Sequence, residues 1–255
     1  MDIGGRRLYI RCRGEGSPSV IFESSWGGDW QDFNSALFVV SQYTRACAYD
    51  RAGLGRSDPI LIKPRTSQDM IEDLHSLLIN ASIPGPYILV GHSLGGFNIR
   101  LFATKYPDEV VGLVSVEGVP VDQFLTCDFP IETPGEDPSF AKARKDCQSS
   151  KAWFLDWTDN PEFLDYFASE DQVRATGSFG DLPLVVLAAE TQTSGKPGTA
   201  EEFGGAIWDR LEREIAALSS NGQYKVIMGS DHGTIVYQKE TIDTIIEMVM
   251  TLQGK

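Results

Sequence analysis

One serine, set between two glycines directly after an apolar run, has the clearest chemical potential in this chain. Residues Gly91-His92-Ser93-Leu94-Gly95 form a G-x-S-x-G pattern, with the apolar segment 87–90 before it and a helical pattern over 93–105 after it. A sharp strand-to-helix turn lifts the serine hydroxyl above the sheet edge. The free N–H groups at the start of the helix then favour the negative charge that develops in acyl transfer. The pattern predicts that Ser93 is a nucleophile.

Acyl transfer also needs a base that takes the serine proton, and histidine is the usual one. The chain has three histidines. His75 lies beside the apolar stripe of a predicted helix, and His92 adjoins the serine, where consecutive side chains point apart. His232 lies in a glycine-flanked loop between a late strand and the final helix. We expect His232 to be the base.

The elements that would position these residues alternate along the chain. Short apolar runs alternate with helical patterns, which is typical of an α/β fold with a mostly parallel sheet flanked by helices. A capping box at Thr66 and Asp69 precedes one apolar helical stripe. The expected strands cover residues 8–11, 20–23, 45–49, 87–90, 111–116, 183–187 and 224–228, and further helices cover 93–105, 200–218 and 241–252.

One segment breaks this alternation. Residues 119–180 are richer in aromatic, proline and acidic residues than the rest of the chain. We interpret them as an inserted, partly helical lid, so that residues 1–118 and 181–255 form the core. Most of the aromatic residues are expected to form the lid's own small core. Trp153 and Trp157 are the ones that we expect to line a substrate pocket.

Three further segments, together with the serine turn, resemble the α/β-hydrolase fold family over almost the whole chain. Residues 20–28 resemble the family's strand and oxyanion loop, residues 49–58 resemble its D-x-x-G-x-G-x-S turn, and residues 230–233 resemble its late histidine loop. The resemblance implies a mostly parallel central sheet flanked by helices. It also implies an oxyanion hole formed by the backbone N–H groups of Trp26 and Leu94.

The chain departs from the family pattern in two places. Ser24 and Ser25 stand where many members have His-Gly, and Gln192 stands where most members have the aspartate that orients the histidine. Some members, as in the haloalkane dehalogenase group, carry this acid after the preceding strand, which here ends just before Glu117. The resemblance therefore favours Glu117 as the acid, with Glu190 as the alternative.

The four cysteines form no C-x-x-C pair and have no histidine at zinc spacing, so we expect no metal site. An even number permits two disulfides without requiring them. In the family's sheet the strands holding Cys12 and Cys47 are neighbours, so these two residues are expected to be bonded or packed together. Cys127 and Cys147 both lie in the predicted lid, where a disulfide between them would restrict the lid's motion. The sequence leaves the state of all four open.

Composition limits the partners. The chain has 255 residues, with 36 acidic against 22 basic side chains and a net charge of −14. This charge disfavours nucleic acid and anionic membrane surfaces. No apolar run reaches the roughly 18 residues of a membrane span. The N-terminus is no signal peptide, so the chain as written is expected to be cytoplasmic, or secreted if a leader precedes residue 1. The oligomeric state stays open.

Taken together, the residues favour a carboxylesterase-like serine hydrolase that acts on a small ester-like molecule through an acyl-enzyme, without cofactor or metal. Lactone, thioester, amide or carbon–carbon bond hydrolysis by the same groups are alternatives, because one fold hosts many chemistries. Another alternative is a slow-turnover ligand receptor that retains the triad. A dehalogenase or epoxide hydrolase is disfavoured, since those family members have aspartate where Ser93 stands.

Overall fold

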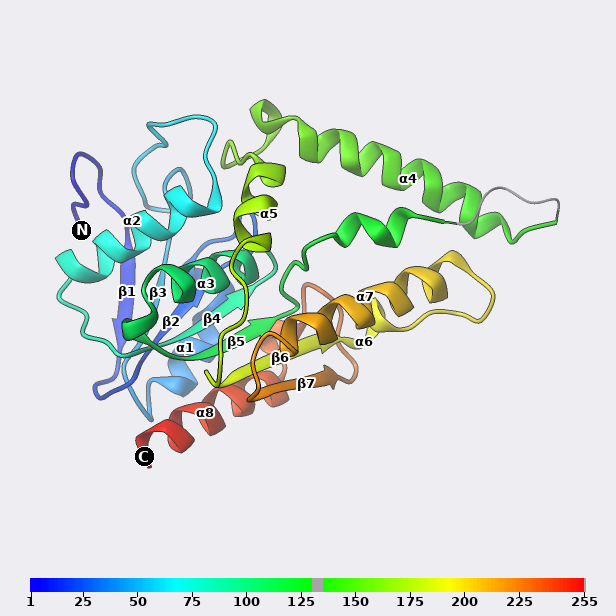
Figure 1. Cartoon of the computed structure of the whole chain (residues 1–255). Helices are drawn as coiled ribbons and strands as arrows, with labels where there is room; N and C mark the ends of the chain where they lie inside the picture. The colour runs from blue at the N-terminus through cyan, green and yellow to red at the C-terminus, as the bar shows by residue number, and fades with distance from the viewer. Residues whose placement is uncertain (130–134, 255) are drawn as a thin grey trace.

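The computed structural model describes residues 1–129 and 135–254. They form one seven-stranded sheet of order β1-β3-β2-β4-β5-β6-β7, in which only β1 runs antiparallel to its neighbour (Figure 1). The expected α/β class and mostly parallel sheet are confirmed. The strands are β1 (Ile10–Arg13), β2 (Ser19–Glu23), β3 (Ala46–Tyr49), β4 (Tyr87–His92), β5 (Val110–Val116), β6 (Leu184–Ala189) and β7 (Gly222–Ile227).

Helices cover both faces of this sheet because side chains along a strand point alternately to opposite faces. Val20 and Phe22 of β2 face the apolar cluster that includes α1 (Asn34–Val40) and α8 (Lys239–Gln253). Ile21 faces the opposite cluster, to which three other helices contribute. These helices are α2 (Ser67–Asn80), α3 (Leu94–Lys105) and α7 (Ala200–Ala216). With both faces covered, β2, β4 and β6 are buried along their whole length.

The first turn of α2 has the expected capping box. The backbone N–H of Thr66 donates to the Asp69 carboxylate at 2.7 Å, and the Thr66 side chain accepts from the N3 backbone. This reciprocal pair satisfies two N–H groups that the helix itself leaves without partners. The start of α2 is therefore set by residues adjacent in sequence.

Between β5 and β6 the chain leaves the sheet, and we call residues 119–180 the insertion. Residues 130–134 of this predicted lid lie outside the described residues. Helix α4 extends away from the sheet and packs against η3 and α7, whereas α5 packs against α2 and α3 (Figure 1). The insertion contains η3 (Gln123–Cys127), α4 (Pro138–Leu155), η4 (Trp157–Asp159) and α5 (Tyr166–Arg174).

The aromatic residues of the insertion do not form a self-contained core. Tyr166 and Leu164 pack in one cluster with Phe97 and Leu94 of α3, and Trp26 joins the same cluster from the loop after β2. The expectation that most of these aromatic residues form a core of their own is therefore wrong for this cluster. The physical reason is that α5 lies directly on α3, so the two elements share one apolar interior.

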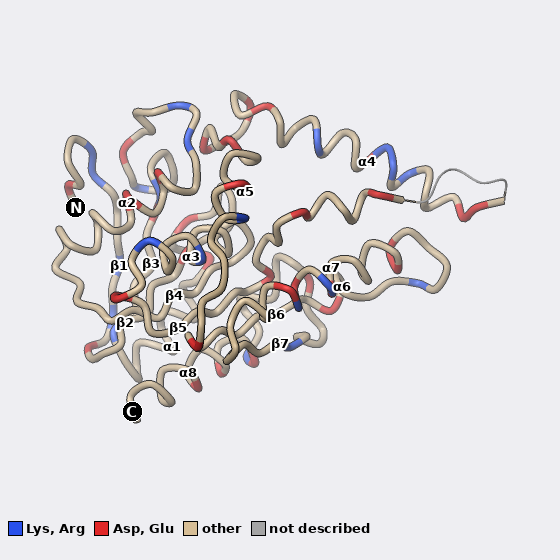
Figure 2. The backbone as a smooth tube through the Cα atoms, in the orientation of Figure 1, with Lys and Arg blue, Asp and Glu red and all other residues tan. Residues whose placement is uncertain are grey.

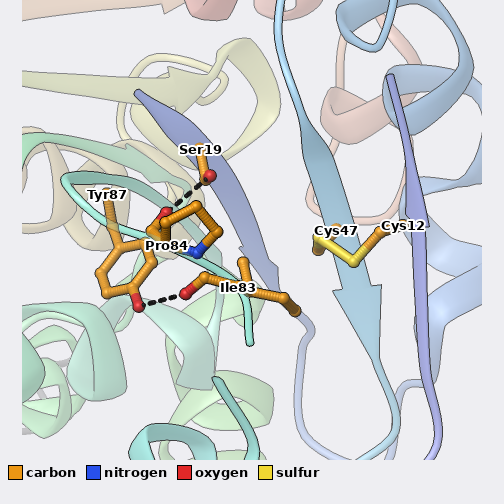
Figure 3. Close-up of a disulfide and its surroundings, with 6 residues drawn as sticks. All are labelled: Cys12, Ser19, Cys47, Ile83, Pro84 and Tyr87. Carbon is orange, nitrogen blue, oxygen red and sulfur yellow. Dashed lines mark hydrogen bonds between the residues drawn. A yellow bond between two sulfur atoms is a disulfide. The ribbon is translucent and has the colours of Figure 1, made fainter. Parts of the chain in front are cut away.

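All four cysteines are paired. Cys12 and Cys47 occupy directly opposite positions of β1 and β3 and form a disulfide with a Cα–Cα distance of 4.1 Å (Figure 3). Cys127, at the end of η3, is bonded to Cys147 of α4. One bridge joins the antiparallel edge strand to the sheet, and the other joins two helices of the insertion.

Charged residues are spread over the whole chain rather than gathered in one segment (Figure 2). Several short basic stretches lie along α4, and both signs occur on the core helix α7 (Figure 2). Across the two described stretches, no helix combines the length and the apolar character that crossing a bilayer requires.

Candidate active site

Ser93 occupies a strained turn between β4 and α3. Its backbone has φ 55° and ψ −118°, a conformation that side-chain-bearing residues rarely adopt. A Cβ atom on Gly91 would collide with the Gly95 carbonyl, and one on Gly95 would collide with the Glu23 carbonyl. Both flanking glycines are therefore required by the close approach of backbone. The turn presents the Ser93 side chain at the carboxyl edge of the sheet, where it is partly exposed.

The strand next to β4 holds this turn in place. The N–H of Ser93 donates to the Val116 carbonyl at 3.3 Å. The Ser93 carbonyl in turn accepts the N–H groups of Gly96 at 2.8 Å and Val119 at 2.9 Å. Strain at one residue persists only where its surroundings over-determine it. These three bonds supply that constraint from α3, from the last residue of β5 and from the chain after it.

His232 lies in the loop between β7 and α8, beside the serine turn. The Asp231 carboxylate accepts the N–H groups of Gly233 at 2.9 Å and Thr234 at 2.8 Å, which closes the loop into a tight turn. Nε2 of His92 donates to the His232 carbonyl at 2.8 Å, and the two imidazole rings lie 4.9 Å apart. The residue before the nucleophile therefore tethers the loop that carries the expected base.

This environment favours the neutral form of both histidines. Burial, with the nearby His232, lowers the pKa of His92 to about 3. Burial also lowers the pKa of His232, against the opposing effect of Asp231. A neutral imidazole is the form that accepts a proton. Within the described residues the His232 ring forms no hydrogen bond, either with the Ser93 hydroxyl or with a carboxylate.

The expected pairing of Glu117 with His232 is not present in this conformation. Glu117 follows β5 with φ 47°, and its Oε2 accepts the N–H of Ala189 at the end of β6. Among the described residues its other oxygen forms no hydrogen bond of normal length, although the side chains of Trp208 and Glu212 of α7 lie nearby. Burial raises the pKa of Glu117 to about 7, which the Ala189 N–H opposes. The left-handed turn and the free N–H of β6 thus direct this carboxylate to α7.

The alternative acid, Glu190, is bonded to the backbone of the histidine loop, but among the described residues it forms no hydrogen bond with the His232 ring. Its Oε2 accepts the N–H of Gly229 at 2.8 Å, and the next N–H, from Thr191, donates to the Ser230 carbonyl at 3.3 Å. Glu190 therefore anchors the start of the loop that ends in His232. Gln192, two residues later, belongs to the short helix α6 (Glu190–Thr193).

The two predicted oxyanion donors lie in the expected elements. Leu94 is the first residue of α3, and Trp26 lies in the loop after β2. In the part of the chain that the structure describes, neither N–H donates to a protein acceptor. An N–H without a partner beside a nucleophile is what an oxyanion site requires.

A buried polar cluster that the sequence did not predict surrounds the Trp26 loop. Arg51, in the turn after β3, forms ion pairs with Glu23 at 2.9 Å and with Glu162 of the insertion at 2.7 Å. All three side chains are at most 2% exposed. Arg51 belongs to the segment that resembles the D-x-x-G-x-G-x-S turn, but no sequence pattern connects it to Glu162, 111 residues away.

The two tryptophans predicted for the substrate pocket have different surroundings. Trp153 of α4 lies against Trp26, with ring centroids 4.9 Å apart, and Phe154 lies 5.2 Å from the same ring. Trp153 is still 40% exposed. Trp157 makes no ring contact among the described residues. The structure therefore brings Trp153, but not Trp157, to the oxyanion loop.

Across residues 1–129 and 135–254, no three histidine, cysteine or carboxylate side chains converge in a way that would hold a metal ion. The polar groups at the carboxyl edge of the sheet include a serine, histidines, the carboxylates of Glu117 and Glu190, and backbone N–H groups. Such groups can carry out nucleophilic acyl transfer without a metal.

A sequence model of the alpha/beta hydrolase fold matches residues 44–190, which is more than half of the chain. Among curated relatives, "Probable transporter efuK" of Hormonema carpetanum is 36% identical over 124 residues, which cover 46% of this chain and 18% of that protein. "Putative carbamate hydrolase RutD" of Yersinia enterocolitica is 32% identical over 117 residues, 45% of this chain and 42% of that protein. The chain thus spans less than half the length of these two relatives.

A solved structure supports the fold over nearly the whole length. A thermophilic esterase from Thermogutta terrifontis superposes with a TM-score of 0.63 and covers 96% of this chain and 94% of its own. The two sequences are 18% identical. At this identity the likeness concerns the fold.

Proposed function

The chain belongs to the α/β-hydrolase family, and from that premise we propose that it is a serine hydrolase of small carboxylic esters. Ser93 is the nucleophile and His232 the base. The observation that carries this proposal is the strained turn at Ser93, lying beside a loop with a neutral histidine that His92 holds in place. The solved esterase of the same fold gives the proposal further support.

In the proposed mechanism, His232 accepts the proton of the Ser93 hydroxyl as its oxygen attacks the ester carbonyl. The tetrahedral intermediate places its negative oxygen at the N–H groups of Trp26 and Leu94. His232 returns the proton to the departing alcohol, which leaves an acyl-enzyme. Water then attacks the acyl group, and His232 takes a proton from that water, so that Ser93 is regenerated and the acid is released. No cofactor or metal takes part.

The proposed acid is Glu117. It follows the strand next to the nucleophile strand, and one of its two oxygens forms no hydrogen bond with the residues that the structure describes. To reach His232, its carboxylate has to release the Ala189 N–H, which requires a side-chain rotation. Glu190 is the alternative, because it already anchors the histidine loop through Gly229.

We also propose that the insertion is a lid that limits the size of the substrate. Trp153 and Phe154 of α4 lie over Trp26, whose backbone N–H is one of the proposed oxyanion donors. An ester bound at Ser93 would therefore meet these rings.

The two disulfides support a location outside the reducing cytosol, since such bonds persist mainly in oxidising compartments.

The proposal is tested with a fluorophosphonate probe and a substrate panel. We expect the probe to label the wild-type protein at Ser93, and we expect Ser93→Ala to abolish both labelling and ester hydrolysis without lowering Tm. The panel contains esters, lactones, thioesters, amides and carbamates of graded acyl length, measured by steady-state kinetics. Faster turnover of a class other than esters would replace the substrate assignment, and a single turnover that then stops would favour the receptor alternative. Labelling at a different serine would overturn the proposal.

A further inference from the structure

The guanidinium of Arg51 has a complete set of hydrogen-bond acceptors. It carries five N–H donors in a planar fork. Nε and Nη2 donate to the two carboxylate oxygens of Glu162, each at 2.7 Å. Nη1 donates to Glu23 at 2.9 Å and to the Ser24 carbonyl at 2.8 Å, and Nη2 donates also to the Ser25 carbonyl at 2.6 Å. One buried side chain thus joins β2, the oxyanion loop and the insertion.

These bonds act on the backbone on both sides of Trp26. The Ser25 carbonyl and the Trp26 N–H belong to the same planar peptide and point in opposite directions. Arg51 holds that carbonyl at 2.6 Å, with a longer bond of 3.1 Å from the Gly28 N–H, and so helps to fix the direction in which the Trp26 N–H points. The next peptide is held as well, since the Gly27 N–H donates to Glu162 Oε1 at 2.9 Å. The orientation of this oxyanion donor therefore depends on Arg51 and Glu162 together.

Glu162 reaches this position because its segment is docked on the core. The N–H of Arg65 donates to the Phe163 carbonyl at 2.8 Å, and the Asp165 N–H donates to the Arg65 carbonyl at 2.7 Å. The side chain of Asn160 closes the same segment, accepting the Leu164 N–H at 2.8 Å. The contact between the insertion and the oxyanion loop is thus made by a fixed piece of chain.

The cluster holds one positive charge between two negative ones. Burial alone would lower the pKa of Arg51, but the Glu162 and Glu23 carboxylates hold it above its usual value. The Tyr49 hydroxyl and the Asn98 side chain donate hydrogen bonds to Glu23, and these bonds help to stabilise the negative charge of its carboxylate. Asn98 belongs to α3, the helix that begins at the nucleophile. The same cluster therefore also connects the oxyanion loop with the serine turn.

We propose that Arg51 and Glu162 are positioning residues that orient the Trp26 N–H toward the oxyanion, so that the oxyanion hole is complete only when the insertion is docked. This inference rests on the proposed ester hydrolysis. An interaction that is stronger in the transition state than with bound ester affects kcat more than KM. Losing one oxyanion donor costs about a hundred- to a thousandfold in kcat, and we expect misorientation of this donor to cost about ten- to a hundredfold.

The experiment compares Glu162→Gln with Asp122→Asn. Asp122 pairs with Arg174 within the insertion, but both side chains are almost half exposed, and neither is bonded to the oxyanion loop. Each protein is first titrated with the fluorophosphonate probe to count active sites. We expect Glu162→Gln to lower kcat per active site about ten- to a hundredfold with KM changed less than about threefold. Asp122→Asn should keep the kcat per active site and the KM of the wild type.

A boronic acid inhibitor, which becomes tetrahedral when the Ser93 oxygen adds to boron, provides the second measurement. It places an oxygen where the oxyanion forms, so its Ki should rise by about the same factor as kcat falls in Glu162→Gln. If the glutamine variant folds poorly, Glu162→Asp is measured in its place. Aspartate keeps the charge but is one methylene shorter, so we expect the same fall in kcat and the same rise in boronate Ki. If Glu162→Gln lowers Tm while kcat per active site and the boronate Ki stay at wild-type values, the role is only structural and the inference is wrong. Absence of ester turnover and of Ser93 labelling in the wild type would instead refute the proposed function.

Discussion

The side chain of His92 donates a hydrogen bond to the backbone carbonyl of His232, with Nε2 and the oxygen 2.8 Å apart. This bond joins the last residue of the nucleophile strand to the loop that carries the proposed base. The two residues are 140 positions apart in the chain. Because it acts on the backbone of His232, it leaves the imidazole of His232 free to receive a proton.

Replacing His92 with phenylalanine tests the pH dependence of stability that this bond implies. The folded pKa of His92 is lowered to about 3, below the unfolded value of 6.5, so the unfolded state binds the proton more tightly between these values. Its contribution to stability is therefore present above pH 6.5 and is lost as pH falls toward 3. We expect urea-unfolding free energies of the wild type to fall more steeply with decreasing pH in this window than those of His92→Phe. Parallel curves would contradict the assignment of a neutral, buried His92.

The identity of the acid is tested by Glu117→Gln and Glu190→Gln. Each glutamine retains an oxygen that accepts the N–H now bound by the native carboxylate, from Ala189 or Gly229, so both folds should persist. If Glu117 rotates to His232 during turnover, Glu117→Gln should lower kcat by roughly two to four powers of ten. Glu190→Gln should have a much smaller effect. The reverse ranking in steady-state kinetics would assign the acid to the end of β6.

Glu212 is a site where substitution should stabilise the protein. Its carboxylate is fully buried in α7, and neither oxygen forms a hydrogen bond within the described stretches. Burial together with Glu117 raises its pKa well above the ordinary value. A raised folded pKa means that the unfolded state loses the proton first as pH rises, so the glutamate becomes destabilising above about pH 4.5.

We therefore expect Glu212→Gln to raise the free energy of unfolding at pH 7, and we expect this gain to shrink toward zero near pH 4. The glutamine keeps the buried polar group and removes only the ionisable proton, and a pKa shift of one unit corresponds to about 1.4 kcal/mol, which sets the scale of the gain. Denaturant unfolding across this pH range measures it. A variant that is less stable than the wild type at pH 7 would show that Glu212 has a favourable partner in solution.

Trp153 and Trp157 provide a matched pair for substrate selectivity. Trp153 contacts Trp26 beside the proposed oxyanion donor, whereas Trp157 makes no ring contact among the described residues. Trp153→Ala should therefore shift the preferred acyl or alcohol length toward larger esters while the smallest ester is hydrolysed as before. Trp157→Ala should leave the kcat/KM series across chain length unchanged. Equal shifts in both variants would mean that the pocket extends over η4.

Much of the fold follows from residues that are neighbours in the sequence. Each of the seven strands lies within two residues of its predicted bounds, because alternation of apolar side chains is a local property. The capping box of Thr66 and Asp69 and the turn around Ser93 are local in the same sense. Their geometry depends on side chains and glycines that lie within a few positions of one another.

The partners of the buried charges were decided only by tertiary structure. Arg51 could be recognised as part of a turn, but its carboxylate partner Glu162 comes from the insertion, and no local pattern links two segments 111 positions apart. Glu117 follows the expected strand, yet the direction of its side chain depends on a left-handed backbone and on the free N–H of Ala189. A buried charge takes the nearest group that compensates it, and which group is nearest is known only once the distant segments have packed.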